Sequence, residues 1–207
     1  MISAVEWAEA LKISVEEGVL AEEAGDYCLG QSVRDIAIRT VILQGVVAVA
    51  YQVDAEPVIE WFHEQEIWDA VTPKEQEFLL LPTRSTEECN RYRAHQEAEW
   101  TLLWVIGKID ALGLPTHYCD TRRLVDEIIP PLGTDIESFV RSAGLQKPGV
   151  LLAEDDRTYT MWCSYWRDRR ESKPLPHDLN ITVLYERRYA FEWLDGIQKW
   201  DDVTCDA

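Results

Sequence analysis

The sequence predicts an all-α fold, a single globular domain of about seven to nine helices packed around one or two central apolar helices. Two observations favour helices: apolar residues recur at helical spacing, and several segments open on helix-capping signals. A third argues against β-structure, because no strand-like alternation of apolar and polar residues flanks a hairpin turn. With 207 residues, 46% of them hydrophobic, and no long linker, the chain can build one large core.

The N-terminal segment is acidic. Residues 1–31 carry seven carboxylates and one lysine, and residues 3–24 have the spacing of an amphipathic helix. Gly25 and Gly30 bracket a break after this segment. We therefore expect residues 1–31 to form an acidic helix that is packed on, or appended to, a helical domain over residues 32–207.

The most apolar helix is expected over residues 32–53, with Arg34 and Arg39 on its first two turns. Its apolar run is about half of the roughly 20 residues that span a bilayer, which indicates a buried helix and not a membrane anchor. Pro57 opens a further helix near residues 56–69, because proline is favoured in the first helical turn.

Two capping boxes place the next two helices. Thr72 with Glu75 starts a short helix that Pro82 ends, and the sequence STEE at residues 85–88 opens a long helix that is expected to reach Ala111. In a capping box the first and fourth residues bond each other's backbone amides, so each box marks a helix start.

The long helix that follows residue 85 is expected to be central, because apolar residues occupy two opposite sides of it. Glu97 and Glu99 lie in the part that should be deepest. The remaining helices are expected within residues 119–131, 134–144, 148–170 and 179–195, the last one stopping at Gly196.

The last helix contains two adjacent arginines. On a helical projection Arg187 falls in the middle of the apolar arc, and Arg188 falls on its border near Glu192. A buried guanidinium needs carboxylates or carbonyls around it, because a stranded buried charge costs about 3–5 kcal/mol. We expect a structural clamp, with an anion or substrate site as the alternative. The expected partners of Arg187 are Glu97, Glu99, Asp201 and Asp202. Trp200 is expected to fold back and cover the pair.

The C-terminal stretch ERRYAFEWLDGIQKWDDVTCDA resembles the end of the bacterial domain-of-unknown-function family 4272, whose members tend to end in ERR-A-x-x-W-L followed by W-D-x-V. Further matches are RDIAIRTVIL, TPKEQEFL, EAEWTLLWVIGKID and YTMWCSYWRDRR, so the resemblance covers most of residues 33–206. Residues 113–155 match poorly, and the tail reads Cys205-Asp206-Ala207 where Asp-Thr is expected. The resemblance implies a mainly helical fold and no established activity.

The charge balance restricts the partners. The chain has 38 acidic and 20 basic residues, a net charge of -18. Such a surface repels nucleic acid and anionic lipid, so we expect neither nucleic-acid nor membrane binding. The five cysteines are scattered singly, which fits a reducing compartment, and the N-terminus lacks the basic and apolar regions of a signal peptide. A cytoplasmic location is therefore expected.

Motifs for common chemistries are missing from the sequence. Glu60 and His63 form a single E-x-x-H, whereas a di-iron bundle needs two. His95 and Glu99, one turn apart, would supply only two metal ligands. There is no phosphate-binding glycine loop and no G-x-S-x-G nucleophile motif. We therefore predict no catalytic residue, no cofactor and no metal site, and leave open whether the protein is an enzyme.

Two functions remain. The first is a macromolecular interaction or regulatory protein whose acidic face binds a basic protein partner, for example by capping the cleft of a basic toxin or effector. That face would comprise Glu6, Glu9, Glu16, Glu17, Asp54, Glu56, Glu60 and Glu64. The alternative is a small-molecule-binding protein or enzyme with a pocket between helices. Tryptophans would line this pocket, and Arg187, Arg188, Glu97 and Glu99 would gate it.

Overall fold

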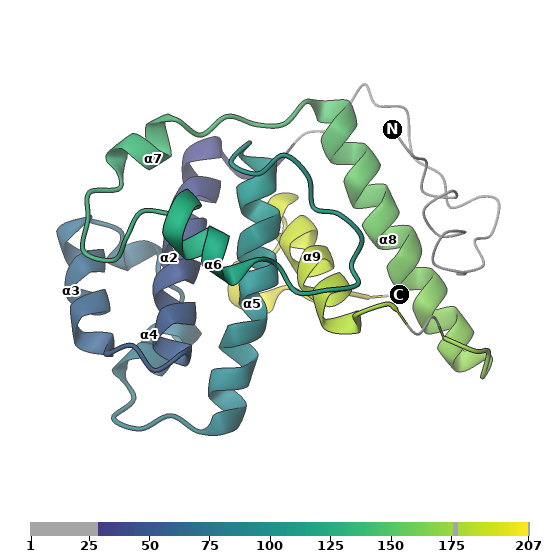
Figure 1. The fold of residues 1–207 in the computed structure, drawn as a ribbon, viewed down its shortest axis with the longest axis horizontal. Coiled ribbons are helices and arrows are strands. Elements are labelled where there is room, and N and C mark those ends of the chain that lie inside the picture. Colours follow the sequence, from purple (N-terminus) through teal and green to yellow (C-terminus); the bar gives the residue numbers. More distant parts are fainter. Residues whose placement is uncertain (1–28, 176–177, 207) are drawn as a thin grey trace.

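The computed structural model describes residues 29–175 and 178–206. The predicted N-terminal helix over residues 3–24, with Glu6, Glu9, Glu16 and Glu17, lies outside these residues. The described chain contains eight α-helices and no strand, in agreement with the predicted all-α fold (Figure 1).

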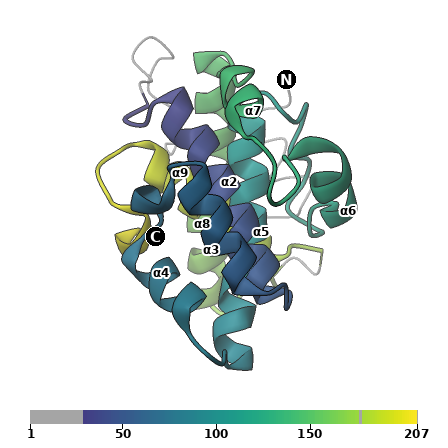
Figure 2. The same cartoon turned by 90° about the vertical axis from the view of Figure 1, so that its left-hand side faces the viewer.

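Two helices form the centre of the domain. Helix α2 (Val33–Ala50) and helix α5 (Thr86–Val105) lie side by side and make the most extensive contact between any two elements (Figures 1 and 2). Helix α2 is buried on nearly all sides from Ile36 to Ala50. An apolar helix without a polar face is stable only when other elements surround it, which explains its central place.

The other elements cover this pair. Helices α3 (Ala55–Glu64) and α4 (Pro73–Leu80) pack beside α2, helix α9 (Ile181–Leu194) packs on α5, and the long helix α8 (Pro148–Arg170) lies outside α9 (Figure 1). The short elements are η1 (Trp68–Ala70), α6 (Thr121–Arg123), the π-helical turn η2 (Leu124–Ile128), α7 (Glu137–Arg141) and η3 (Trp200–Asp202).

Helix α5 ends at Val105, six residues before the expected Ala111. Gly107 has a φ of 71° and donates to the Trp104 carbonyl, while Lys108 donates to the Leu103 carbonyl. These two bonds form a Schellman motif, which closes a helix with a left-handed residue and favours glycine there. The expected end at Ala111 is therefore wrong, because Gly107 is the stop signal of this helix.

The end of α9 meets the beginning of the described chain. The Gly30 amide donates to the Leu194 carbonyl over 2.9 Å, and the Gln31 side chain donates to the Trp193 carbonyl over 3.2 Å. A Cβ atom on Gly30 would lie 2.2 Å from the Asp195 carbonyl oxygen, so only glycine permits this approach.

The structure also bears on membrane association. Within residues 29–175 and 178–206, none of the helices combines the length and hydropathy that a bilayer-spanning segment requires.

Candidate functional site

Arg187 lies in the core between α9 and the loop that follows α5, with 2% of its surface exposed. Its Nη1 donates to the Gly113 carbonyl over 2.7 Å and its Nη2 to the Leu112 carbonyl over 2.9 Å. The hydrogen-bond partners of Arg187 are therefore backbone carbonyls and not the expected carboxylates. The reason is the early end of α5, because the chain turns at Gly107 and carries two loop carbonyls to the guanidinium. Burial lowers the pKa of Arg187, and the nearby carboxylates of Glu154 and Glu97 oppose this fall.

Arg188 joins α9 to α8. Its Nη1 lies 2.9 Å from an Asp155 carboxylate oxygen, and its Nη2 bonds Glu192, the residue expected beside it. The guanidinium also lies 4.8 Å from the centre of the Tyr159 ring. Only 11% of the side chain is exposed, so Arg188 is more deeply buried than its expected position on the border of the apolar arc implies.

The two glutamates of α5 have different surroundings. The Oε1 of Glu97 accepts a hydrogen bond from the Cys119 amide over 2.6 Å. Burial raises the pKa of Glu97, and this hydrogen bond partly opposes the rise. Glu99 is fully buried, and neither of its oxygens has a hydrogen-bond partner among the described residues. Burial raises the pKa of Glu99 well above its ordinary value.

Replacing Glu99 with methionine is expected to raise the free energy of unfolding near neutral pH by about 1–3 kcal/mol, because an unsatisfied buried polar group is removed. The gain should depend on pH. Below the ordinary carboxyl pKa of 4.5, Glu99 is protonated in both the folded and unfolded chains. As pH rises above that value the unfolded chain ionises first, so Glu99 destabilises the native protein increasingly and the advantage of methionine grows.

Chemical denaturation of both proteins across this pH range measures the effect. Glu87→Met is the control, since Glu87 lies exposed on the first turn of the same helix. A gain from Glu99→Met that is as large in acid as at neutral pH would show that Glu99 does not titrate with a raised pKa.

The C-terminal residues pack over a different arginine from the one expected. Trp200 is 4% exposed, and its ring centre lies 5.2 Å from the Arg39 guanidinium carbon. Asp201 accepts hydrogen bonds from the Thr72 hydroxyl (2.7 Å) and the Lys74 amide (3.0 Å), at the N-terminus of α4. A carboxylate is favoured there because helix N-termini carry partial positive charge. Asp202 is exposed.

Arg39 belongs to a buried ion pair that the sequence interpretation missed. Its Nη1 lies 2.9 and 3.0 Å from the two carboxylate oxygens of Glu75, and its Nη2 donates to the Ala70 carbonyl over 2.8 Å. The two side chains are 4% and 1% exposed. The sequence held a signal for this pair, because Arg39 interrupts a helix that is apolar on all sides and such a charge needs a partner. A charged, Trp-covered clamp therefore exists, but at Arg39.

His95 provides a second buried polar contact. Its Nδ1 lies 2.8 Å from a Glu186 carboxylate oxygen, and the rings of Tyr92, Tyr189 and Trp200 surround it. Burial opposes the charged imidazole, but the Glu186 carboxylate outweighs this and the pKa of His95 is raised. The carboxylate that His95 contacts is thus that of Glu186, and not that of Glu99, with which it was considered as a possible pair of metal ligands. In the part of the chain that the structure describes, no three His, Cys, Asp or Glu side chains are grouped to hold a metal ion.

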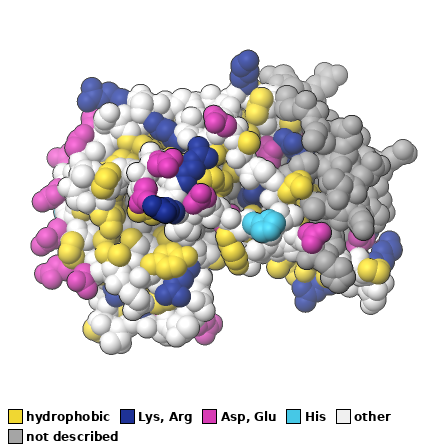
Figure 3. Space-filling model, viewed as in Figure 1, with side chains coloured by type: hydrophobic (Ala, Val, Ile, Leu, Met, Phe, Trp, Pro, Cys, Tyr) yellow, Lys and Arg dark blue, Asp and Glu magenta, His cyan; other side chains and the backbone are white. Residues whose placement is uncertain are grey.

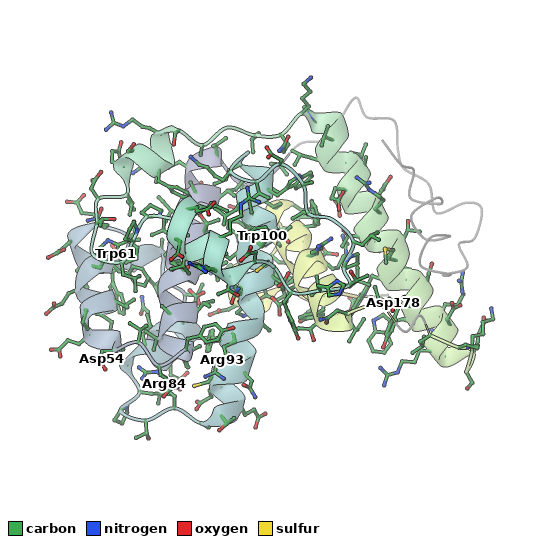
Figure 4. The ribbon with its side chains drawn as sticks, viewed as in Figure 1. Asp54, Trp61, Arg84, Arg93, Trp100 and Asp178 are labelled. Carbon is green, nitrogen blue, oxygen red and sulfur yellow. The ribbon has the colours of Figure 1, made fainter. Side chains whose placement is uncertain are left out.

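The predicted acidic face is partly described. Glu56, Glu60 and Glu64 are exposed on α3, opposite its buried side chains Val58, Trp61 and Phe62, and Asp54 is exposed at the N-cap of the helix. Acidic side chains line the left-hand edge of the molecule over this helix in Figure 3, and Figure 4 labels Asp54 at its beginning. We call the surface formed by Asp54, Glu56, Glu60 and Glu64 the α3 face. Its four carboxylates make no ion pair or hydrogen bond within residues 29–175 and 178–206.

Comparison with known proteins places the chain in a family whose description names no function. No curated protein and no solved structure matches the chain. A family model described as Domain of unknown function (DUF4272) matches residues 9–203, which is nearly the whole sequence.

Proposed function

We propose that this chain, which belongs to the family described as Domain of unknown function (DUF4272), is an interaction protein. It binds a basic protein partner through the α3 face. The observation that carries this proposal is a stripe of exposed carboxylates without counter-charges. Glu56, Glu60 and Glu64 follow each other at four-residue spacing, and no Lys or Arg occurs in residues 40–73.

Repulsion within the stripe costs stability, although the helix dipole favours Glu56 in the first turn of α3. Like charges four residues apart on a helix destabilise it by about 0.2–0.5 kcal/mol per pair, and the stripe contains two such pairs. Glu64 is also the last residue of α3, where the helix dipole disfavours negative charge. A basic partner would relieve both costs and would approach faster through electrostatic attraction.

One concrete form of this function is neutralisation of a basic toxin or effector, with the α3 face covering the cationic cleft of the target. The carboxylates on α3 are supported by a rigid buried side, because Trp61 and Phe62 anchor the helix in the core. A fixed row of charges loses little conformational freedom on binding, which favours specific recognition.

The alternative of a pocket gated by Arg187 and Glu97 is less well supported. Arg187 bonds two loop carbonyls and Glu97 accepts from a backbone amide, so both are engaged inside the protein. A hollow of about 550 Å³ does adjoin Trp200 and Arg39, but both Nη atoms of Arg39 are bound to Glu75 and Ala70.

The substitution Glu60→Lys tests the proposal, because it should affect stability and binding in opposite directions. Two repulsive pairs become attractive, so the free energy of unfolding should rise by about 1–2 kcal/mol. Retention of the partner in affinity capture from the native host should fall at least tenfold. Asp110→Lys is the matched control, since it makes the same charge change at an exposed residue far from α3 in the sequence.

The result depends on whether the partner is lost with Glu60→Lys alone. A partner held by the parent protein and by Asp110→Lys, lost with Glu60→Lys and released by added salt supports the α3 face. A partner retained equally by all three proteins contradicts it, as does retention that salt does not weaken.

A further inference from the structure

A cleft unrelated to the α3 face opens between α2, α5 and the α6–η2 segment. It consists of two adjoining hollows of about 670 and 400 Å³, and Tyr51, Gln96 and Thr121 form part of the wall of both. Figure 1 shows α6 lying across α2 and α5 at this place. Volumes of this size are typical of small-molecule sites. We call the two together the α2–α5 cleft.

The larger hollow is cationic although the chain carries a net charge of -18. Arg91 and Arg93 of α5 line it together with the polar side chains of Asn90 and Thr182. Glu97 is the one acidic residue in this wall, and it is bound to the Cys119 amide. Neither arginine forms an ion pair with a carboxylate of the described residues.

Arg93 is held in place with one edge open. Its Nε donates to the Ala50 carbonyl over 2.8 Å, its Nη1 lies 3.3 Å from the Asn90 amide oxygen, and the guanidinium stacks 5.1 Å from the centre of the Tyr51 ring. Its Nη2 has no partner in the described chain. Figure 4 labels this side chain on α5, beside the C-terminal end of α2. A fixed guanidinium fork suits a carboxylate.

The smaller hollow is apolar and has one polar group in its wall. Val47, Leu124, Pro131 and Leu132 contribute to its lining. Gln44 also lines it; this residue is 6% exposed, yet its amide has no hydrogen-bond partner among the described residues. The amide of Gln44 is not fully enclosed, so a ligand atom in the hollow can form a hydrogen bond with it.

Apolar side chains at the rim remain in water. Tyr51, Val53 and Val125 are 51%, 42% and 44% exposed, and all three line the cleft. Exposed apolar residues that are gathered around a hollow and mixed with polar groups mark binding sites. The rim therefore offers apolar surface that a ligand can cover.

We propose that the α2–α5 cleft binds a small organic acid with an apolar body, its carboxylate held by Arg91 and Arg93 and a hydroxyl or carbonyl at its far end bonded to Gln44. The length follows from α2: Ala50, which Arg93 bonds, and Gln44 are six residues apart, or about 9 Å at 1.5 Å per residue. A linear acid of about ten carbons with a terminal hydroxyl is longer than this when fully extended, so it can reach both groups with a few gauche bonds in its chain.

Calorimetric titration of the full chain with 10-hydroxydecanoate tests the proposal, with decanoate, butyrate and 1-decanol as comparisons. Saturable binding at one site is expected for the hydroxy acid. Decanoate should bind about two- to tenfold more weakly because it lacks a partner for Gln44. Butyrate lacks the apolar body and 1-decanol lacks the charge, so both should fail to saturate the site.

Variants separate the two ends of the cleft. Arg91→Gln/Arg93→Gln should weaken binding of the hydroxy acid at least tenfold, while glutamine can still donate to the Ala50 carbonyl. Arg122→Gln/Arg123→Gln, which removes two exposed cations outside the cleft wall, should leave the affinity within twofold. Gln44→Leu should abolish the preference for the hydroxy acid over decanoate. Thermal melting of each variant confirms that it is folded.

Other binding results would contradict the proposal or one part of it. The proposal is overturned by absence of saturable binding to the parent protein, or by an affinity that the Arg91/Arg93 double variant leaves unchanged. Equal binding of decanoate and 10-hydroxydecanoate overturns the role of Gln44. None of these results bears on the α3 face, which lies on another element and is tested by protein capture.

Discussion

The substitution Arg39→Leu is expected to lower the free energy of unfolding by about 3–5 kcal/mol, because it strands the buried carboxylate of Glu75. Arg39 supplies both hydrogen bonds of that ion pair and a third to the Ala70 carbonyl, and it lies under the Trp200 ring. Urea denaturation followed by circular dichroism measures the change. A loss of this size is a large part of the stability of a typical domain.

Two further variants identify the cause of that loss. Arg39→Leu/Glu75→Gln should recover part of the stability, since a neutral amide replaces the stranded charge while the α4 capping box keeps an acceptor. Arg34→Leu is the control, because Arg34 is 63% exposed and its contact with Glu137 is 3.7 Å long. If Arg39→Leu unfolds at the same urea concentration as Arg34→Leu, the ion pair is not part of the stable core.

The second large effect is expected for Trp200→Ala, about 3–5 kcal/mol, the usual cost of deleting a large buried aromatic ring. Trp200 is nearly fully buried, and its ring centre lies 4.9 Å from that of Tyr189 and 5.4 Å from that of Trp193. Its loss also opens the Arg39–Glu75 pair to water. Equilibrium denaturation at fixed pH and salt gives the magnitude.

Ile197→Ala is the matched control for this change. Ile197 precedes Trp200 in the same tail but is 87% exposed, so its truncation should change the stability by less than about 0.5 kcal/mol. The Arg39→Leu/Trp200→Ala double variant should lose less than the sum of the single losses, because the two side chains touch. Strict additivity would indicate that Trp200 acts independently of the ion pair.

The fold was predictable where the sequence carries local signals. Pro148 and the capping boxes at Thr72 and Ser85 start helices at their expected positions, and Gly196 ends the last one with a φ of 74°. These signals act within one turn of helix and do not depend on the rest of the chain. The long helix ends earlier than expected because its stop signal, Gly107, lies inside a stretch of apolar residues at helical spacing.

The contacts of the candidate site were less predictable because they join distant segments. Helical periodicity places Arg187 on the apolar side of α9, but which carbonyls or carboxylates meet it depends on how the loop after α5 runs. The same holds for Arg39, whose partner Glu75 is 36 residues away. The α2–α5 cleft is a third example, since its walls come from three segments whose packing periodicity does not specify.

The docking of Trp200 and Asp201 links the segment that follows α9 with the first turns of α2 and α4. Until this segment has docked, the Arg39–Glu75 pair is uncovered and the start of α4 lacks its acidic partner. Segments that are far apart in the sequence must therefore meet before this part of the core closes, and contacts of such long sequence separation slow folding.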